Sequence, residues 1–161
     1  MEKYKNIKYY EGQWFGVPLR QGGYALGIIV RGSHKTKGGL GYFFGPKYYR
    51  IPDESDTFEK KKDDAVLISW FGDLGILNGR WPLIQSSRQF SRNEWPLPLF
   101  GREISLIPNK GMIVEYEDNP KGEWRIIKEI PVDIEEIANL PSDGYLGGGA
   151  IEIRLSKLFE N

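Results

Sequence analysis

Residues 13–31 read QWFGVPLRQGGYALGIIVR, in which two apolar runs flank the short polar segment Arg20-Gln21-Gly22-Gly23. Two apolar runs joined by a short loop with paired glycines are typical of a β-hairpin, because glycine readily adopts the positive φ angles of tight turns. Pro18 has no backbone N–H, so we expect it at a sheet edge or at the end of a strand. The hairpin predicts a fold built around an antiparallel sheet.

Apolar segments further along the chain extend this sheet. The run AVLISWF at residues 65–71 is almost continuously apolar and lies between Asp64 and Gly72, so we predict that it is the central and most buried strand. The segment AIEIRLSKLF at residues 150–159 alternates apolar and charged residues as far as Leu155, which favours a last strand. Other strands are predicted at residues 40–44, 48–51, 80–84, 101–107, 112–116 and 124–130, with a turn at Gly45-Pro46.

Helix signals are few. Residues 131–138 can form about two helical turns, with Asp133 as the N-cap and Pro141 as the stop. The charged residues 53–64 are predicted to be a surface connection, with Phe58 as the apolar anchor of any short helix there. No internal repeat or linker is visible, which predicts one domain over residues 1–161. The predicted fold class is mainly β (β-rich α+β), a bent antiparallel sheet or partly open barrel with a short helix near the C-terminal end.

Composition agrees with many short strands. Five Trp, nine Tyr and eight Phe make up 14% of the chain, and they are accompanied by 20 Gly and 10 Pro. Aromatic residues suit half-buried strands, whereas Gly and Pro favour turns. The chain has no cysteine, no apolar run near the ~20 residues of a membrane span, and no apolar centre in its N-terminal stretch. We therefore expect a cytoplasmic protein with no membrane partner.

The charge balance argues against nucleic acid as a partner. Twenty-two Lys and Arg residues match twenty-two Asp and Glu residues, so the net charge is zero. A general nucleic-acid binder normally carries a basic excess, because contacts with phosphates supply most of its affinity.

The inventory of reactive residues is poor, so we predict no catalytic, cofactor-binding or metal-binding residue and no cofactor. His34 is the single histidine, and it lies in the polar segment SHKTKGG, where we expect it to be exposed. The paired carboxylates are adjacent to turns or alternate along strands, which favours solvated faces. The glycines at residues 38–41 and 147–149 do not match a phosphate-binding pattern.

The most distinctive segment is WFGDLG at residues 70–75, followed by GRWP at residues 79–82. We predict that Asp73 bonds backbone amides of the turn after the strand at residues 65–71. Trp81 and Trp95 each precede a proline and are therefore expected to be extended. They are either part of the core or rigid anchors of a binding surface. For Trp81 we favour burial, with Gly75 and Gly79 leaving room for its ring.

Five motifs together resemble a known family. They are GQWFGVPL (12–19), YALGIIV (24–30), LGYFFG (40–45), ISWFGDLGILNGRWP (68–82) and EWPLPLF (94–100). Their succession is similar to the bacterial immunity protein 26 family, over roughly residues 10–120. The residues that carry the likeness are expected to be structural rather than reactive. They are Trp14, Phe15, Gly16, Pro18, Phe44, Phe71, Gly72, Asp73, Gly75, Gly79, Trp81, Pro82, Trp95 and Pro96.

The resemblance implies an immunity protein that binds and neutralises a cognate polymorphic toxin encoded nearby. It identifies no residue of the partner-binding surface and no oligomeric state. Since the family also includes a protein described as a phosphotriesterase, an ester hydrolase is the alternative. A β-rich module that binds a small ligand or a peptide is a third possibility.

Overall fold

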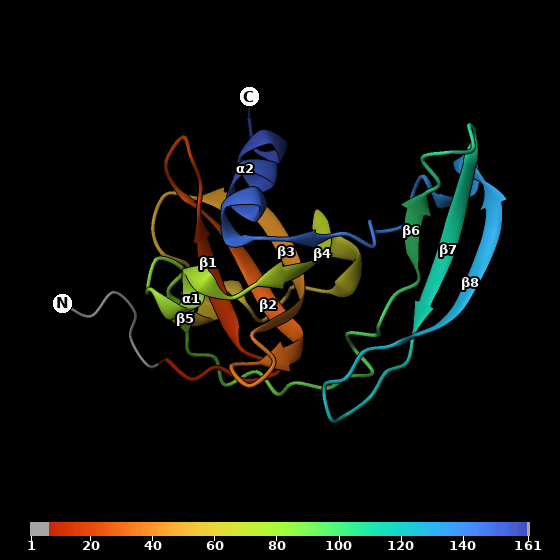
Figure 1. Cartoon of the computed structure of the whole chain (residues 1–161). Helices are drawn as coiled ribbons and strands as arrows, with labels where there is room; N and C mark the ends of the chain where they lie inside the picture. Colours follow the sequence, from red (N-terminus) through yellow and green to blue (C-terminus); the bar gives the residue numbers. More distant parts are fainter. Residues whose placement is uncertain (1–6, 161) are drawn as a thin grey trace. The chain divides into compact units, whose positions relative to one another are not determined.

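The computed structural model describes residues 7–160, and it divides into two compact units (Figure 1). Unit 1 consists of Met1–Trp95 and Tyr145–Asn161, and unit 2 is Pro96–Gly144. The first six residues, part of the N-terminal stretch discussed above, lie outside the described residues. The mainly β fold class is confirmed. One domain over residues 1–161 stays a prediction.

Unit 1 is built on a six-stranded sheet in the order β5-β1-β2-β3-β4-β9. Its strands are β1 (Trp14–Pro18), β2 (Tyr24–Ser33), β3 (Gly38–Tyr48), β4 (Leu67–Gly72), β5 (Leu83–Ile84) and β9 (Tyr145–Leu146). Neighbouring strands are antiparallel except β4 and β9, which are parallel. Two strands of two residues each form the ends of the order, so the sheet is open and does not close into a barrel.

The predicted hairpin is confirmed. In the β1–β2 register, Trp14 lies opposite Ile28 and Pro18 lies opposite Tyr24, which places the proline at the end of its strand. In the turn, Gly22 has φ of 97° and Gly23 has φ of 83°. Both angles lie in the left-handed region that favours glycine, which explains the glycine pair in the sequence.

Two predicted details of the sheet are wrong. Residues 67–71 of this predicted central strand lie in β4, next to the end strand β9 and with only three of the six β4 residues buried, whereas β2 and β3 are central and eight of the ten β2 residues are buried. An apolar run therefore does not by itself determine the position of a strand in the sheet. Gly45-Pro46 was predicted to turn the chain, yet it lies within the continuous strand β3.

The predicted last strand is also wrong, because residues 150–159 belong largely to helix α2 (Gly148–Leu158). Its buried residues Ile151 and Leu155 lie one turn apart and pack into the main core with Phe15, Phe43 and Phe71 of the sheet. A one-turn helix, α1 (Leu74–Leu77), adds Ile76 to the same core.

The charged residues 53–64 contain two 3₁₀ helices, η1 (Glu54–Asp56) and η2 (Lys62–Asp64). The predicted anchor Phe58 is 47% exposed, whereas Thr57 is fully buried. The hydroxyl of Thr57 lies 2.7 Å from that of Ser86, so a polar contact holds this segment.

Unit 2 is a three-stranded antiparallel sheet of β6 (Phe100–Glu103), β7 (Lys110–Tyr116) and β8 (Ile126–Asp133), in that order. A 3₁₀ helix, η3 (Ile134–Ile137), packs its buried Ile137 over Gly101 and Gly111, where a Cβ atom would collide with that side chain. The helix predicted at residues 131–138 is confined to these four residues of η3. Asp133 is its N-cap as expected, but Pro131 belongs to β8.

Candidate functional site

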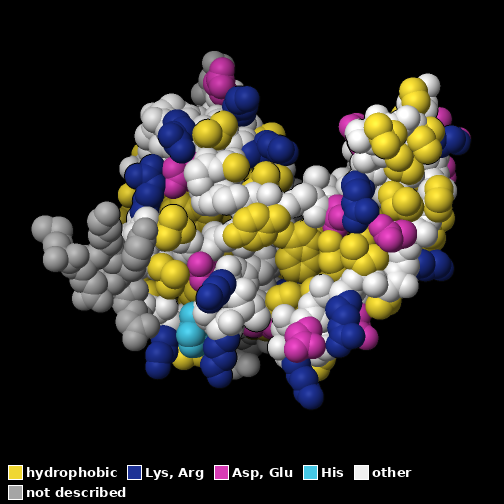
Figure 2. Space-filling view, in the orientation of Figure 1, with side chains coloured by type: hydrophobic (Ala, Val, Ile, Leu, Met, Phe, Trp, Pro, Cys, Tyr) yellow, Lys and Arg dark blue, Asp and Glu magenta, His cyan; other side chains and the backbone are white. Residues whose placement is uncertain are grey.

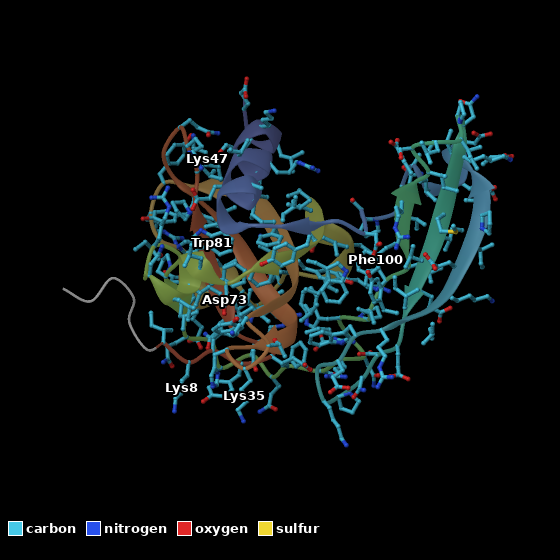
Figure 3. The ribbon with its side chains drawn as sticks, viewed as in Figure 1. Lys8, Lys35, Lys47, Asp73, Trp81 and Phe100 are labelled. Atoms are coloured by element: carbon cyan, nitrogen blue, oxygen red, sulfur yellow. The ribbon has the colours of Figure 1, made fainter. Side chains whose placement is uncertain are left out.

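A buried carboxylate of α2 joins the distinctive GRWP segment to the helix. Glu152 is 3% exposed, and its carboxylate accepts hydrogen bonds from Nε and Nη2 of Arg80 at 2.8 and 2.9 Å and from Nε1 of Trp81 at 2.8 Å. Arg20 from the β1–β2 turn forms an ion pair with it at 3.5 Å. Three segments far apart in the sequence therefore meet at one side chain. Of the residues in this group, Figure 3 labels Trp81.

The charge state of Glu152 follows from these partners. Burial alone raises the pKa of this carboxyl, but hydrogen bonds from Arg80 and Trp81, with the positive charges of Arg80 and Arg20, outweigh it and hold the pKa below its usual value. The carboxylate therefore stays ionised at neutral pH. The side chains of Arg80 and Arg20 remain about half exposed, so the ion pairs reach the surface.

Sequence reasoning missed Glu152 because it assigned the segment to a strand. The available signal was the spacing of Ile151, Glu152, Leu155 and Ser156, two pairs of residues four apart, which places all four on one side of a helix. All four are buried. The hydroxyl of Ser156 donates to the carbonyl of Glu152 at 2.6 Å and accepts from the amide of Arg20 at 2.8 Å.

The prediction that Asp73 bonds backbone amides of the following turn is wrong. It precedes α1, yet its side chain makes no capping hydrogen bond. Instead, its Oδ2 accepts a hydrogen bond of 2.6 Å from the hydroxyl of Tyr9, which is fully buried. Burial, this hydrogen bond and the charge of Asp73 raise the pKa of Tyr9 well above its usual value. Figure 3 marks Asp73 within unit 1.

His34 lies beside this pair and is partly buried rather than exposed as predicted. Its amide donates to the carbonyl of Tyr9 at 3.1 Å, and its ring is edge-on to that of Tyr10 at 5.2 Å. The loop after β2 is thereby fixed to the segment before β1.

Gly72 at the end of β4 leaves room for Tyr145 of the neighbouring strand β9. A Cβ atom at Gly72 would collide with the hydroxyl of Tyr145.

A second aromatic cluster contains Trp14, Tyr42, Phe44 and Trp95. The ring of Trp95 lies 5.5–5.9 Å from each of the other three. The guanidinium of Arg88 lies over the rings of Trp14 and Trp95 at 5.6 and 5.3 Å, which is cation–π geometry. Burial raises the pKa of Tyr42 to about 12, although the charge of Arg31 opposes the shift.

The cluster also holds two arginines. Arg31 is fully buried, and its Nη1 donates to the carbonyl of Trp95 at 3.0 Å. Nη1 of Arg88 donates to the carbonyls of Thr57 and Lys60 at 2.6 and 2.7 Å, which fixes the charged segment at residues 53–64.

Unit 2 contains a charged cluster and an open pocket of about 640 Å³. Arg102 pairs with Asp143 at 2.6 Å and with Glu129 at 2.9 Å, and Asp143 also accepts a hydrogen bond from the hydroxyl of Tyr116. Burial and the contact with Asp143 raise the pKa of Tyr116. The pocket is lined partly by Arg102, Asp143 and Ile137. Two of the charged groups at the pocket, Arg102 and Asp143, are thus already paired with each other.

Most of the fourteen residues singled out from the sequence lie in the interior of unit 1. The buried ones are Trp14, Phe15, Gly16, Phe44, Phe71, Gly72, Asp73, Gly75, Trp81 and Trp95. Pro18, Pro82 and Pro96, the last of which belongs to unit 2, are partly buried, and Gly79 is exposed. Their structural role stays a prediction, and burial is what that role requires.

The described residues contain neither a metal-binding group nor a membrane-spanning helix. Among residues 7–160, no group of three His, Cys, Asp or Glu residues could hold a metal ion. No helix in the same range is long and apolar enough to cross a membrane.

Comparison with known proteins identifies one family. A family model described as Immunity protein 26 matches residues 10–112, which is more than half of the chain. The match runs from the segment before β1 to the start of β7 and includes the sheet of unit 1 apart from β9. No curated protein and no solved structure matches the chain.

Proposed function

Since the chain belongs to the Immunity protein 26 family, we propose that it is a cytoplasmic immunity protein that binds a cognate polymorphic toxin and blocks its active site or the path of its substrate. The observation that carries the proposal is the family match, which covers the β1–β2 hairpin, β3, β4 and the GRWP segment. A protein with this role acts through a stable complex, so its function lies in a surface.

The site geometry agrees with such a role. Glu152, Asp73 and Arg31 are buried and already bound by other groups of the chain. These contacts fix α2, the segment before β1 and the residues around Trp95 on one sheet. A rigid scaffold of this kind loses little conformational entropy when it binds, which favours high affinity.

The test is direct binding to the toxin domain encoded next to this chain. We expect the purified proteins to form a complex in calorimetry, with a dissociation constant of ~1 nM, which corresponds to a binding free energy of about 12 kcal/mol. An interface of ~1,600 Å² with a few buried anchors can supply this affinity. Co-expression should restore growth of cells that produce the toxin.

A toxin domain of unrelated sequence serves as the control and should not bind. If the cognate toxin forms no complex at micromolar concentration, and co-expression does not reduce its toxicity, the proposal is wrong.

A further inference from the structure

The zero net charge of the chain conceals two opposite charges. Unit 2 has ten Asp and Glu residues against five Lys and Arg residues, a net charge of −5. The remainder of the chain has twelve acidic and seventeen basic residues, a net charge of +5. Eight of the ten carboxylates of unit 2 are exposed. Unit 2 therefore presents an acidic surface to solvent.

Strand β8 places apolar side chains within this acidic surface. Seven of its eight residues are exposed, and Ile126, Ile127 and Ile130 are 41%, 57% and 38% exposed. Hydrophobic side chains are visible beside Asp and Glu side chains over unit 2 (Figure 2). Exposed apolar side chains beside charged ones occur at protein-binding surfaces.

The outer edge of β8 is also open, whereas the other edge of its sheet is covered. Residues 141–143 run along β6. The amide of Gly101 donates to the carbonyl of Pro141 at 2.8 Å, and the amide of Asp143 donates to the carbonyl of Gly101 at 3.0 Å. Within residues 7–160, no strand pairs with the outer edge of β8. The end strands of unit 1 have two residues each, so β8 is the longest open edge described.

The register shows which backbone groups this edge offers. The amide of Ile134 donates to the carbonyl of Asn109 at 2.9 Å, and Ile130 lies opposite Ile113 in the same register. The backbone N–H and C=O groups of the even-numbered residues in this part of β8 therefore point toward β7. The backbone groups of Glu129 and Pro131 point outward. Since proline has no N–H, it fits this outward position and stops an added strand from extending beyond it.

We propose that unit 2 carries the toxin-binding surface, centred on the open edge of β8, and that the toxin meets it with a basic segment. The inference rests on the proposed function and adds the location and the chemistry of the contact. Opposite charges accelerate the encounter, the exposed isoleucines supply apolar area, and the backbone of Glu129 pairs with the incoming segment.

The test uses the full chain, the toxin domain encoded beside it, and two matched pairs of variants. Ile127→Lys and Glu135→Lys alter exposed residues of unit 2, and Ile153→Lys and Glu59→Lys make the same changes at exposed residues of unit 1. We expect each unit 2 variant to weaken binding about tenfold or more, as central interface residues do, and each unit 1 variant to bind like wild type. Thermal melting should show that all four are folded.

Two further measurements address the mechanism of contact. The association rate constant should fall as salt concentration rises, because salt screens the attraction between the acidic unit and a basic partner. Hydrogen exchange of the Glu129 amide should slow in the complex.

Each alternative outcome is decisive. If the toxin binds and only the unit 1 variants weaken the complex, or if none of the four does, the inference is wrong and the proposed function stands. If wild type binds no toxin at all, both are wrong.

Discussion

The indole Nε1 of Trp81 lies 2.8 Å from Oε2 of Glu152, although the two residues are 71 positions apart. Trp81 is fully buried, and its ring stacks on that of Phe15 with an angle of 4° between the planes. The side chain of Trp81 thus packs on the sheet and also donates a hydrogen bond to α2, the helix that packs on the same sheet. The stability of unit 1 therefore depends on this pair.

Replacing Glu152 with alanine should destabilise the fold by about 1–3 kcal/mol, because the buried N–H of Trp81 loses its acceptor. The two arginines remain half exposed and can be solvated, which limits the loss. Urea denaturation measures the change. Glu160→Ala, at an exposed residue beyond the end of α2, is the control and should unfold like wild type.

The contribution of Glu152 should depend on pH. Because its folded-state pKa is lowered, the stabilisation is fully present above the ordinary pKa of a glutamate and is lost as the pH falls through the lower folded-state value. The difference in unfolding free energy between wild type and Glu152→Gln should therefore be constant near neutral pH and shrink in acid. A difference that stays constant down to the acid unfolding transition would contradict the lowered pKa.

Replacing Trp81 with alanine should cost about 3–5 kcal/mol, enough to unfold much of a marginally stable domain. If the variant melts like wild type yet loses toxin binding, Trp81 belongs to the interface and the structural prediction is wrong.

The two glycines near Trp81 should respond differently to alanine. A Cβ atom at Gly75 would lie 2.7 Å from the indole, so Gly75→Ala should cost about 1–3 kcal/mol through overpacking. At Gly79 the space is open but φ is 77°, so Gly79→Ala should cost about 1–2 kcal/mol through backbone strain. Combining each change with Trp81→Phe should relieve part of the overpacking caused by Gly75→Ala and none of the backbone strain caused by Gly79→Ala. Denaturation of the two double variants measures this difference.

Asp73→Ala should destabilise the protein by about 1–3 kcal/mol, because the buried hydroxyl of Tyr9 loses its acceptor. Asp73→Asn keeps an acceptor of similar size and should lose less. Both variants should still bind the toxin once folded. Loss of binding by the variants without loss of stability, measured by calorimetry and thermal melting, would identify a contact surface instead.

Local sequence signals predicted the parts of the fold that local chemistry determines. The glycine pair at residues 22 and 23 identified the β1–β2 hairpin, and Asp133 identified the start of η3. Gly75 was correctly expected to leave room for Trp81, whereas a Cβ atom at Gly79 would have no neighbour within 4 Å and so would not meet the ring. Gly79 has a positive φ, which is a property of the backbone that the spacing of residues did not reveal.

The remaining errors concern contacts between distant segments. AIEIRLSKLF is compatible with both strand and helix periodicity, and packing of Ile151 and Leu155 on the sheet selects the helix. The Tyr9–Asp73 hydrogen bond joins residues 64 positions apart, so no local pattern indicates it. The family resemblance over residues 10–120 was confirmed by the match at residues 10–112.

The position of α2 in the chain has a consequence for synthesis. The sheet of unit 1 is nearly complete once the ribosome has made residue 84, but the carboxylate that bonds Trp81 belongs to residue 152. Until α2 emerges, the face of the sheet that carries Phe15, Phe43 and Phe71 lacks Ile151 and Leu155 of its covering layer, although all of unit 2 has already been translated. Nascent chains of this protein should therefore bind chaperones until α2 has emerged from the ribosome, and unit 2 can fold first.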